Sequence, residues 1–301
     1  MRIELTDTTA SAVRTELTKF SQRLGGLTTG VVLNLIIVTS EADQHDAVRA
    51  ASQAGREHPC RVIAVIARNG RSGSRLDAEI VVGEDAPGQT VVLRIYGELS
   101  QHADSVVTPL LVSDTPVVTW WPGAAPSVAA ADPIGVLAQR RVTDAAASDQ
   151  PVQMLTRLAA GYQPGDTDLA WTRATPWRSL LAAALDRPHS AISSATVGAE
   201  QENASADLMA AWLAARLGIP AQLENTAGPG VTGISLATTA GPIAINRFDG
   251  RNATLSRPGE PDRHVALHRR DTADLLAEEL RRLDPDEVYG EALAEFATHG
   301  R

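Results

Sequence analysis

The sequence is poor in cysteine and lysine, two side chains that often carry covalent or phosphate chemistry. Cys60 is the only cysteine and Lys19 the only lysine among 301 residues. A single cysteine excludes an internal disulfide and a zinc site built from several thiolates. No phosphate-binding loop or Schiff base can rely on lysine unless Lys19 provides it. Because Cys60 precedes the apolar run 62–67, we expect a buried, inert thiol.

Long apolar runs and an excess of positive charge are also missing. The longest apolar stretch, 31–38, is interrupted by Asn34 and falls well short of the ~18 to 20 residues of a membrane helix. The first residues have no signal-peptide core, so we expect a cytoplasmic protein without membrane association. Thirty-six acidic against 27 basic residues give a net charge of -9. This balance argues against a nucleic-acid partner, because phosphate backbones require a concentrated basic face.

Recognisable catalytic motifs are missing as well. Residues 228–233 match the letters of the dinucleotide fingerprint, but a β-patterned segment follows where a helix is required, and Pro229 removes a backbone donor. His264 and His268 are four residues apart, yet the alternation between them indicates a strand with a solvated face and not a zinc-binding helix. We therefore predict a protein that is not an enzyme, with no catalytic, cofactor-binding or metal-binding residues.

What the sequence does contain is a regular succession of strand and helix patterns, which predicts an α/β fold. Each half begins a β-α-β unit: strand 31–39, helix 40–56 and strand 61–67 in the first half, and strand 191–197, a helix from 203 or 205 to 217 and strand 221–225 in the second. The shared order predicts two packed α/β lobes with mixed sheets. An internal duplication and a coincidence both remain open. A turn-rich segment, 161–165, divides the lobes into residues 1–160 and 161–301.

The other elements follow from periodicity and from start and stop signals. Expected helices are 8–24, 99–111, 132–139, 177–185 and two closing helices that start at Asp271 and Asp286. Expected strands are 79–82, 90–96, 116–121, 141–145, 233–238, 242–247, 253–256 and 264–268. Residues 123–131 and 145–150 carry no hydrophobic pattern and are expected to be surface loops.

Tryptophan is the informative residue type, since four of the five tryptophans fall in two short motifs. The first motif is PVVTWWPG, residues 116–123. Strand alternation places Trp120 and Trp121 on opposite faces, and Trp121 meets Pro122 where the strand stops. We therefore expect Trp121 to reach the surface at the carboxyl end of the sheet, where ligands and partners bind in open α/β sheets.

The second motif, GDTDLAWTRATPWR at residues 165–178, combines tryptophan with arginine, the pairing typical of interface hot spots. We expect neighbouring tryptophan faces to hold the guanidinium group of Arg173. The predicted partner-binding residues of both motifs are Trp120, Trp121, Trp171, Arg173, Trp177 and Arg178. The alternative, that these rings only seal the junction between the lobes, stays open.

Four stretches carry a family resemblance: REHPCRVIAVI (56–66), PLLVSDTPVVTWWPG (109–123), DPIGVLAQRRVTDA (132–145) and GDTDLAWTRATPWRSLL (165–181). Together they resemble the OpcA family of glucose-6-phosphate dehydrogenase assembly proteins in its actinobacterial form. The resemblance implies a non-catalytic protein that binds glucose-6-phosphate dehydrogenase, promotes its active oligomer and so supports NADPH production in the oxidative pentose phosphate pathway. Cyanobacterial relatives are linked to thiol-based redox control. With Cys60 alone, this chain cannot form an intramolecular switch.

A second function class remains open beside this resemblance. The chain could be a sugar-phosphate- or nucleotide-binding α/β protein, or an enzyme, with its site at the carboxyl edge of a sheet. Arginine forks can grip a phosphate bidentately, and the candidates for such a grip are Arg140, Arg141, Arg173 and Arg178. A small-molecule ligand is therefore not excluded.

Overall fold

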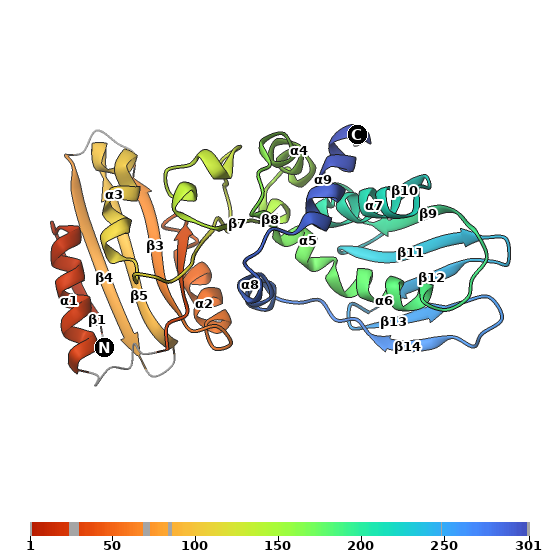
Figure 1. Cartoon of the computed structure of the whole chain (residues 1–301), viewed down its shortest axis with the longest axis horizontal. Helices are drawn as coiled ribbons and strands as arrows, with labels where there is room; N and C mark the ends of the chain where they lie inside the picture. Colours follow the sequence, from red (N-terminus) through yellow and green to blue (C-terminus); the bar gives the residue numbers. More distant parts are fainter. Residues whose placement is uncertain (1, 24–29, 69–72, 84–85, 248, 300–301) are drawn as a thin grey trace. The chain divides into compact units, whose positions relative to one another are not determined.

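The structure is a computed structural model that describes the chain except residues 1, 24–29, 69–72, 84–85, 248 and 300–301 (Figure 1). The chain divides into two compact units. Unit 1 consists of Met1–Thr143 and Thr272–Pro285, and unit 2 of Asp144–Asp271 and Asp286–Arg301. Both units combine helices with a sheet, as predicted. The division into domains of residues 1–160 and 161–301 remains a prediction.

Unit 1 has a mainly parallel sheet. Its strands are β1 (Arg2–Leu5), β2 (Leu33–Val38), β3 (Cys60–Arg68), β4 (Arg75–Gly83), β5 (Ala86–Tyr96), β6 (Val117–Trp120) and β7 (Arg140–Thr143). They follow the order β1-β4-β5-β3-β2-β6-β7. The neighbours from β5 to β7 are parallel, whereas β4 pairs antiparallel with β5 and with β1. Strands β2 and β3 are buried along most of their length, as expected in the centre of a parallel sheet.

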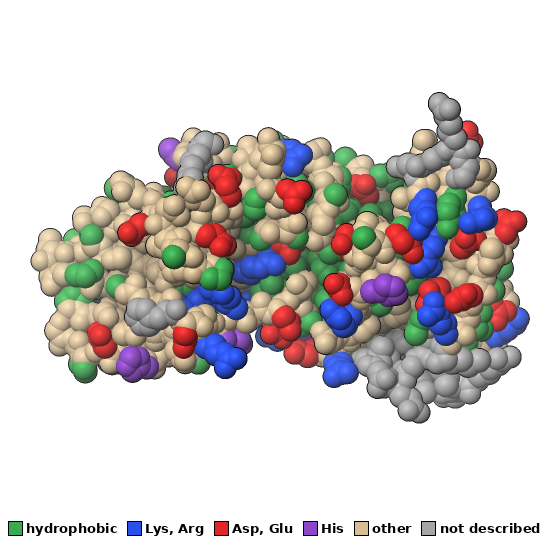
Figure 2. Space-filling view, turned by 180° about the vertical axis from the view of Figure 1, so that it is seen from behind, with side chains coloured by type: hydrophobic (Ala, Val, Ile, Leu, Met, Phe, Trp, Pro, Cys, Tyr) green, Lys and Arg blue, Asp and Glu red, His purple; other side chains and the backbone are tan. Residues whose placement is uncertain are grey.

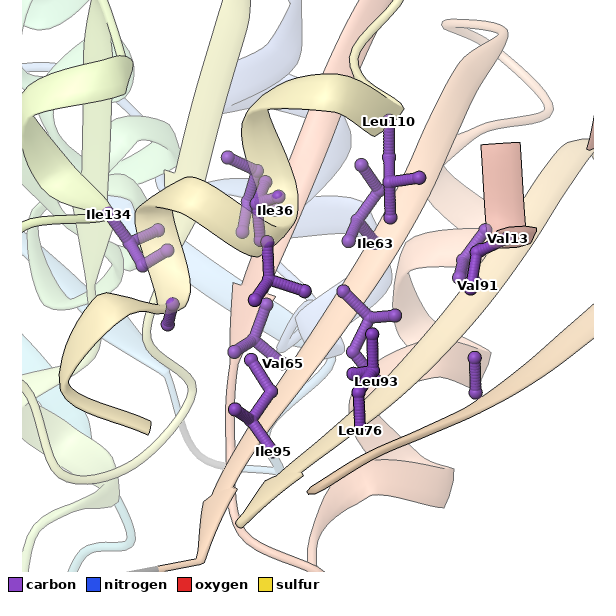
Figure 3. Packing of buried hydrophobic residues seen from close by; sticks show 14 of the residues in the cluster. Val13, Ile36, Ile63, Val65, Leu76, Val91, Leu93, Ile95, Leu110 and Ile134 are labelled. Carbon is purple, nitrogen blue, oxygen red and sulfur yellow. The ribbon is translucent and has the colours of Figure 1, made fainter. Parts of the chain in front are cut away.

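Helices cover both faces of this sheet. They are α1 (Ala10–Arg23), α2 (Gln44–Ala54), α3 (Ala103–Val107) and α8 (Thr272–Arg281). On one face, Val13 of α1 packs with Ile63 and Val91 of the sheet and Leu110 of the segment after α3 (Figure 3). The helix expected at 8–24 is thereby confirmed, with Val13, Leu17 and Phe20 buried, while its expected last residue, Leu24, lies outside the described residues. Helix α2 presents buried alanines that allow close packing, and α8 packs against it.

Two helices expected in unit 1 form only in part. The segment expected at 99–111 is a 3-10 turn (Gly97–His102), then α3, then a 3-10 turn (Thr108–Leu110) that contains Pro109. Because proline lacks an N–H, Pro109 cannot donate the next helical hydrogen bond, which ends α3 early. The helix expected at 132–139 is a single 3-10 turn, Gly135–Leu137. There the carboxylate of Asp132 accepts hydrogen bonds from the amides of Ile134 and Gly135, an alternative to helical pairing.

Unit 2 has a mainly antiparallel sheet. Its strands are β8 (Asp166–Asp168), β9 (Ile192–Ala199), β10 (Ala221–Asn225), β11 (Val231–Thr238), β12 (Ile243–Arg247), β13 (Asn252–Ser256) and β14 (Arg263–Ala266). Six of them form a sheet of order β10-β9-β11-β12-β13-β14, in which the pair β9–β10 is parallel and the other pairs are antiparallel. The shared order of the two halves thus extends to one β-α-β unit in each, and the remaining topologies differ.

Five helices of the described chain belong to unit 2: α4 (Pro151–Gly161), α5 (Leu169–Arg173), α6 (Thr175–Leu185), α7 (Ala204–Leu217) and α9 (Glu287–His299). Sequence analysis missed α4, which begins with Pro151. Helices α6 and α7 pack on one face of the sheet, where Leu181 and Met209 meet Ile234. In α7, the side chain of Asn203 caps the amide of Ala206 at 3.0 Å, as its position before the helix predicted.

The opposite face of the unit 2 sheet carries small side chains. Thr196, Ser235, Ala244 and Ser256 lie opposite one another in successive strands, and each is partly exposed. On the face of the molecule in Figure 2, Lys and Arg side chains lie interspersed with Asp and Glu side chains and form no continuous basic area. Among the described residues, no helix is long and apolar enough to cross a membrane.

Candidate functional site

The carboxyl end of the unit 1 sheet is the first place to seek a ligand, because β2 is its switch point: β3 pairs on one side and β6 on the other. The loop after β2 contains no glycine and presents Glu41. One carboxylate oxygen of Glu41 accepts from Arg94 Nε at 2.9 Å, and the other lies 2.8 Å from Arg68 Nη2. The hydrogen bond from Arg68 is the main cause of a lowered pKa at Glu41. An ion-paired carboxylate, held by two arginines, thus lies where such sheets hold a pyrophosphate.

Trp120 and Trp121, at the end of β6, are both buried, with 1% of each residue exposed. The prediction that Trp121 reaches the surface is wrong. Its amide continues the sheet by donating to Val142 O at 2.9 Å, and Gly135 lies against its ring so closely that an added Cβ would be 3.2 Å from the ring. Unit 1 therefore encloses Trp121 with the turn that replaces the expected helix at 132–139.

The second motif builds a buried charge cluster in unit 2. Arg173 donates to both carboxylate oxygens of Asp144, at 2.6 and 2.8 Å. Asp168 caps α5 by accepting from Ala170 N at 2.8 Å, and its other oxygen accepts from Ala145 N at 2.9 Å. Burial lowers the pKa of Arg173, but the hydrogen bonds and charge of Asp144 outweigh this effect and leave the pKa raised. The expectation that tryptophan faces hold Arg173 is wrong, because Asp144 holds it.

A tryptophan does hold the other arginine of this motif. The guanidinium carbon of Arg178 lies 3.5 Å from the centroid of the Trp171 ring. The indole nitrogen of Trp171 donates to Asp286 Oδ2 at 2.8 Å, and the ring of Tyr289 lies 5.9 Å away, centroid to centroid. Trp177, a residue of α6 that is 2% exposed, belongs to the hydrophobic core between this helix and the sheet. Within unit 2 these aromatic rings serve packing.

Of the six predicted partner-binding residues, the four tryptophans are thus buried, while Arg173 and Arg178 keep partial exposure. Their role in binding a partner remains a prediction. Two of the four arginines proposed to bind a phosphate are instead paired with carboxylates. Arg173 pairs with Asp144. Arg140 pairs with Glu279 inside unit 1, and the side chains of Arg140 and Glu279 are almost fully buried.

Unit 2 contains a pocket of about 240 Å³ that no sequence motif predicted. It lies among the start of α6, the start of α7, the loop before β11 and the residues at and after the ends of β12 and β14. Four arginines line it: Arg173, Arg247, Arg269 and Arg270. Because they come from distant segments, only the run of residues 268–270, His-Arg-Arg, could have signalled the pocket in the sequence.

Arg247 dominates the electrostatics of this pocket. It is 9% exposed; its Nη2 donates to Val231 O at 2.6 Å, and its Nε has no hydrogen-bond partner among the described residues. Burial, together with the positive charge of Arg269, lowers the pKa of Arg247 to about 10. Carbonyl groups orient the guanidinium but do not neutralise it, so the pocket retains an excess of positive charge.

The segments that we rejected as cofactor or metal sites are now placed. Residues 228–233 form a loop that runs into β11, as predicted, and Gly230 N donates to Glu200 Oε1 at 2.9 Å. His264 lies in β14 and contacts Thr254 Oγ1 at 3.3 Å, whereas His268 lies beyond the strand, which ends two residues earlier than expected. Cys60 is 1% exposed, and burial raises its pKa to about 12, which confirms a buried thiol.

Comparison with known protein families matches both halves of the chain. The models that match describe the two domains of the glucose-6-phosphate dehydrogenase subunit OpcA: residues 51–160 match its N-terminal domain, and residues 164–293 match its C-terminal domain. The chain belongs to the OpcA family. The resemblance inferred from the four sequence stretches is thereby confirmed. The alternative, that the chain functions as a sugar-phosphate- or nucleotide-binding α/β protein or as an enzyme with its site at the carboxyl edge of a sheet, is not favoured.

Among solved structures, this OpcA-family chain is similar to oxidoreductases at low identity. KijD10, a 3-ketoreductase from Actinomadura kijaniata, is 11% identical, with a TM-score of 0.46, over 87% of this chain and 94% of that one. An oxidoreductase from Sinorhizobium meliloti is 11% identical, with a TM-score of 0.41, over 88% and 86% of the two chains. Identities this low carry no information about activity. Among curated proteins, none matches the sequence significantly.

Proposed function

We propose that this protein is a non-catalytic partner of glucose-6-phosphate dehydrogenase that binds the enzyme and promotes its active oligomer. The observation that carries the proposal is the pair of family matches, which cover residues 51–160 and 164–293 and both name a subunit of this dehydrogenase. By raising the activity of that enzyme, the protein would support NADPH production in the cytoplasm.

Activation by a partner requires differential binding. A protein raises the activity of an enzyme only if it binds the active form more tightly than the inactive form. A tenfold shift of that equilibrium corresponds to ~1.4 kcal/mol of preference. A few interface contacts supply this amount, so the proposal needs no catalytic group on the partner.

The geometry of unit 1 supports the non-catalytic part of the proposal. Dinucleotides bind parallel α/β sheets at the switch point, where glycines let the backbone approach a pyrophosphate. In this chain Glu41 occupies the loop at that point and is held there by Arg68 and Arg94. Its carboxylate already engages Arg68 and Arg94, and the loop has no glycine that would let the backbone approach a pyrophosphate, so this end of the sheet is poorly suited to a nicotinamide cofactor.

The experiment that tests the proposal is co-elution with the cognate dehydrogenase. The two purified proteins are mixed over a range of ratios and separated by size-exclusion chromatography with light scattering. The proposal predicts a complex that contains both chains, and a larger dehydrogenase oligomer in the mixture than in the enzyme alone. Independent elution of the two proteins at all ratios would contradict it.

A matched pair of variants locates the contact within the second motif. Arg178→Gln removes a partly exposed guanidinium that lies on Trp171, whereas Arg216→Gln removes one from the exposed end of α7. If the second motif contacts the dehydrogenase, only the first change weakens co-elution, and both variants keep the wild-type melting temperature to within a few degrees. Equal binding by both variants would remove Arg178 from the interface.

A further inference from the structure

The pocket of unit 2 contains a buried cation without a counter-ion. Arg247 forms no ion pair with any described carboxylate, and its two hydrogen bonds go to the main-chain oxygens of Val231 and Leu267. Proteins rarely bury a guanidinium in this way, because a desolvated charge needs an opposite charge or a full set of acceptors. An anion that enters the pocket would supply what the chain does not.

A second arginine adds to the positive charge. Arg269 lines the same pocket and donates to the main-chain oxygen of Pro229, which again orients the guanidinium without neutralising it. The charge of Arg269 acts on Arg247 across the pocket wall and is one cause of its lowered pKa. A ligand of charge near −2 that contacts both guanidinium groups would offset this repulsion, and their planar forks match the oxygens of a phosphate.

The start of α7 faces the same pocket. Asn203 and Ser205, at the cap and in the first turn of this 14-residue helix, are among the lining residues. The amino end of a helix carries a partial positive charge and favours anions. It thus adds to the positive charge of Arg247, whose guanidinium is met within the chain by two carbonyl oxygens and by the ring of Trp177, 5.0 Å away, but by no carboxylate among the described residues.

The pocket also contains one acidic lining residue, which restricts the kind of anion. Glu200 is exposed, and one of its oxygens accepts from Gly230 N at 2.9 Å and from Asn203 Nδ2 at 3.1 Å. A carboxylate repels a bare anion but accepts a hydrogen bond from a hydroxyl group. A phosphate ester that bears hydroxyl groups therefore satisfies both ends of the pocket.

We propose that this pocket binds a phosphate group, either as inorganic phosphate or as the phosphate of a small hydroxylated ester, between Arg247 and Arg269. Planar guanidinium forks match the oxygens of a phosphate, and a volume of about 240 Å³ suits a small phosphorylated molecule and not a dinucleotide. The residues of the site all come from this chain, so a test of phosphate binding does not depend on whether the chain binds the dehydrogenase.

Calorimetric titration of the full chain at constant ionic strength tests the site. The probes are inorganic phosphate, glucose 6-phosphate and glucose. The proposal predicts saturable binding of at least one phosphate probe and none of glucose. Tighter binding of glucose 6-phosphate identifies an ester as the ligand, and equal or weaker binding identifies the free ion. No saturable binding of either phosphate probe would overturn the proposal.

Variants show whether binding occurs in this pocket. Arg247→Gln and Arg269→Gln each remove one charge-assisted contact and should weaken phosphate binding about tenfold or more. Arg216→Gln, which removes an exposed arginine of the same unit outside the pocket, should leave the affinity unchanged. Arg269 is at the surface, so its variant decides the question if Arg247→Gln does not fold. An unchanged affinity in Arg269→Gln, or an equal loss in Arg216→Gln, would refute the site.

Discussion

The guanidinium group of Arg173 donates two hydrogen bonds, at 2.6 and 2.8 Å, to the carboxylate of Asp144. Asp144 is 4% exposed, so the pair lies at the edge of the interior and not on an open surface. Asp168, the cap of α5, adds a second negative charge near the same arginine. The tryptophan- and arginine-rich motif therefore organises charges within unit 2, and its arginines differ in what they contact.

We predict that Arg173→Gln destabilises the protein. The change leaves Asp144 buried without its counter-ion, and breaking a buried pair from one side costs ~3 to 5 kcal/mol. Because the side chain of Arg173 is 30% exposed, we expect the lower part of this range or less, about 2 to 3 kcal/mol. Thermal and urea unfolding measure the loss, and the double variant with Asp144→Asn should recover part of it. A melting temperature equal to that of the wild type would show that the pair contributes nothing.

We predict that Gly135→Ala destabilises unit 1 more than an ordinary glycine substitution. An added Cβ would lie 1.9 Å from the carbonyl oxygen of Ala129 and 3.2 Å from the ring of Trp121, so the backbone at Gly135 must move away from that of Ala129. Overpacking of this kind costs ~1 to 3 kcal/mol or more. The matched control is Gly123→Ala, where nothing lies within 4 Å of the added carbon. Equal melting temperatures for the two variants would contradict the close approach.

We predict that two buried tryptophans respond differently to phenylalanine. Trp171 donates its indole N–H to Asp286 at 2.8 Å, whereas the indole nitrogen of Trp120 has no hydrogen-bond partner among the described residues. Both changes remove ring volume, but only Trp171→Phe also removes a hydrogen bond to a charged group, worth ~1.5 to 3 kcal/mol. The free energy of unfolding should therefore be lower for Trp171→Phe than for Trp120→Phe. The reverse order would contradict the hydrogen bond to Asp286.

We predict that Cys60 does not react with a maleimide in the folded protein. Burial raises its pKa to about 12, so at neutral pH the group is a protonated thiol without access to solvent. Mass spectrometry should detect labelling within minutes in denaturant and almost none without it. Rapid labelling of the folded chain would show that Cys60 is exposed and would reopen redox control through a partner thiol.

Periodicity allowed much of the fold to be predicted from the sequence. The β2-α2-β3 and β9-α7-β10 units appear where apolar runs alternate with helical patterns, and α7 is capped by Asn203 and Gly218, as their residue types indicate. Helix predictions failed where a side chain bonded to nearby backbone amides or where a proline interrupted the helical pattern. The carboxylate of Asp132 accepts from the amides of Ile134 and Gly135, where the 3-10 turn Gly135–Leu137 replaces the expected helix, and Pro109 shortens the helix before it.

The candidate sites were harder to predict because they depend on contacts between distant segments. The sequence showed that Trp121 ends a strand but not that Gly135 would lie against its ring. It predicted a tryptophan beside Arg173, whereas Arg178 takes that place, because Asp144, 29 residues before Arg173 in the chain, pairs with Arg173. The pocket around Arg247 combines segments that no local pattern connects.

The most direct test of the proposed function is an initial-rate titration of the cognate glucose-6-phosphate dehydrogenase with this protein. NADPH formation is followed at a fixed enzyme concentration while the OpcA-family chain is added from far below to far above equimolar amounts. The proposal predicts no rate from the added chain alone and a rate that rises and saturates in the mixture, with the same concentration dependence as complex formation. A dehydrogenase rate unchanged at every concentration would contradict it.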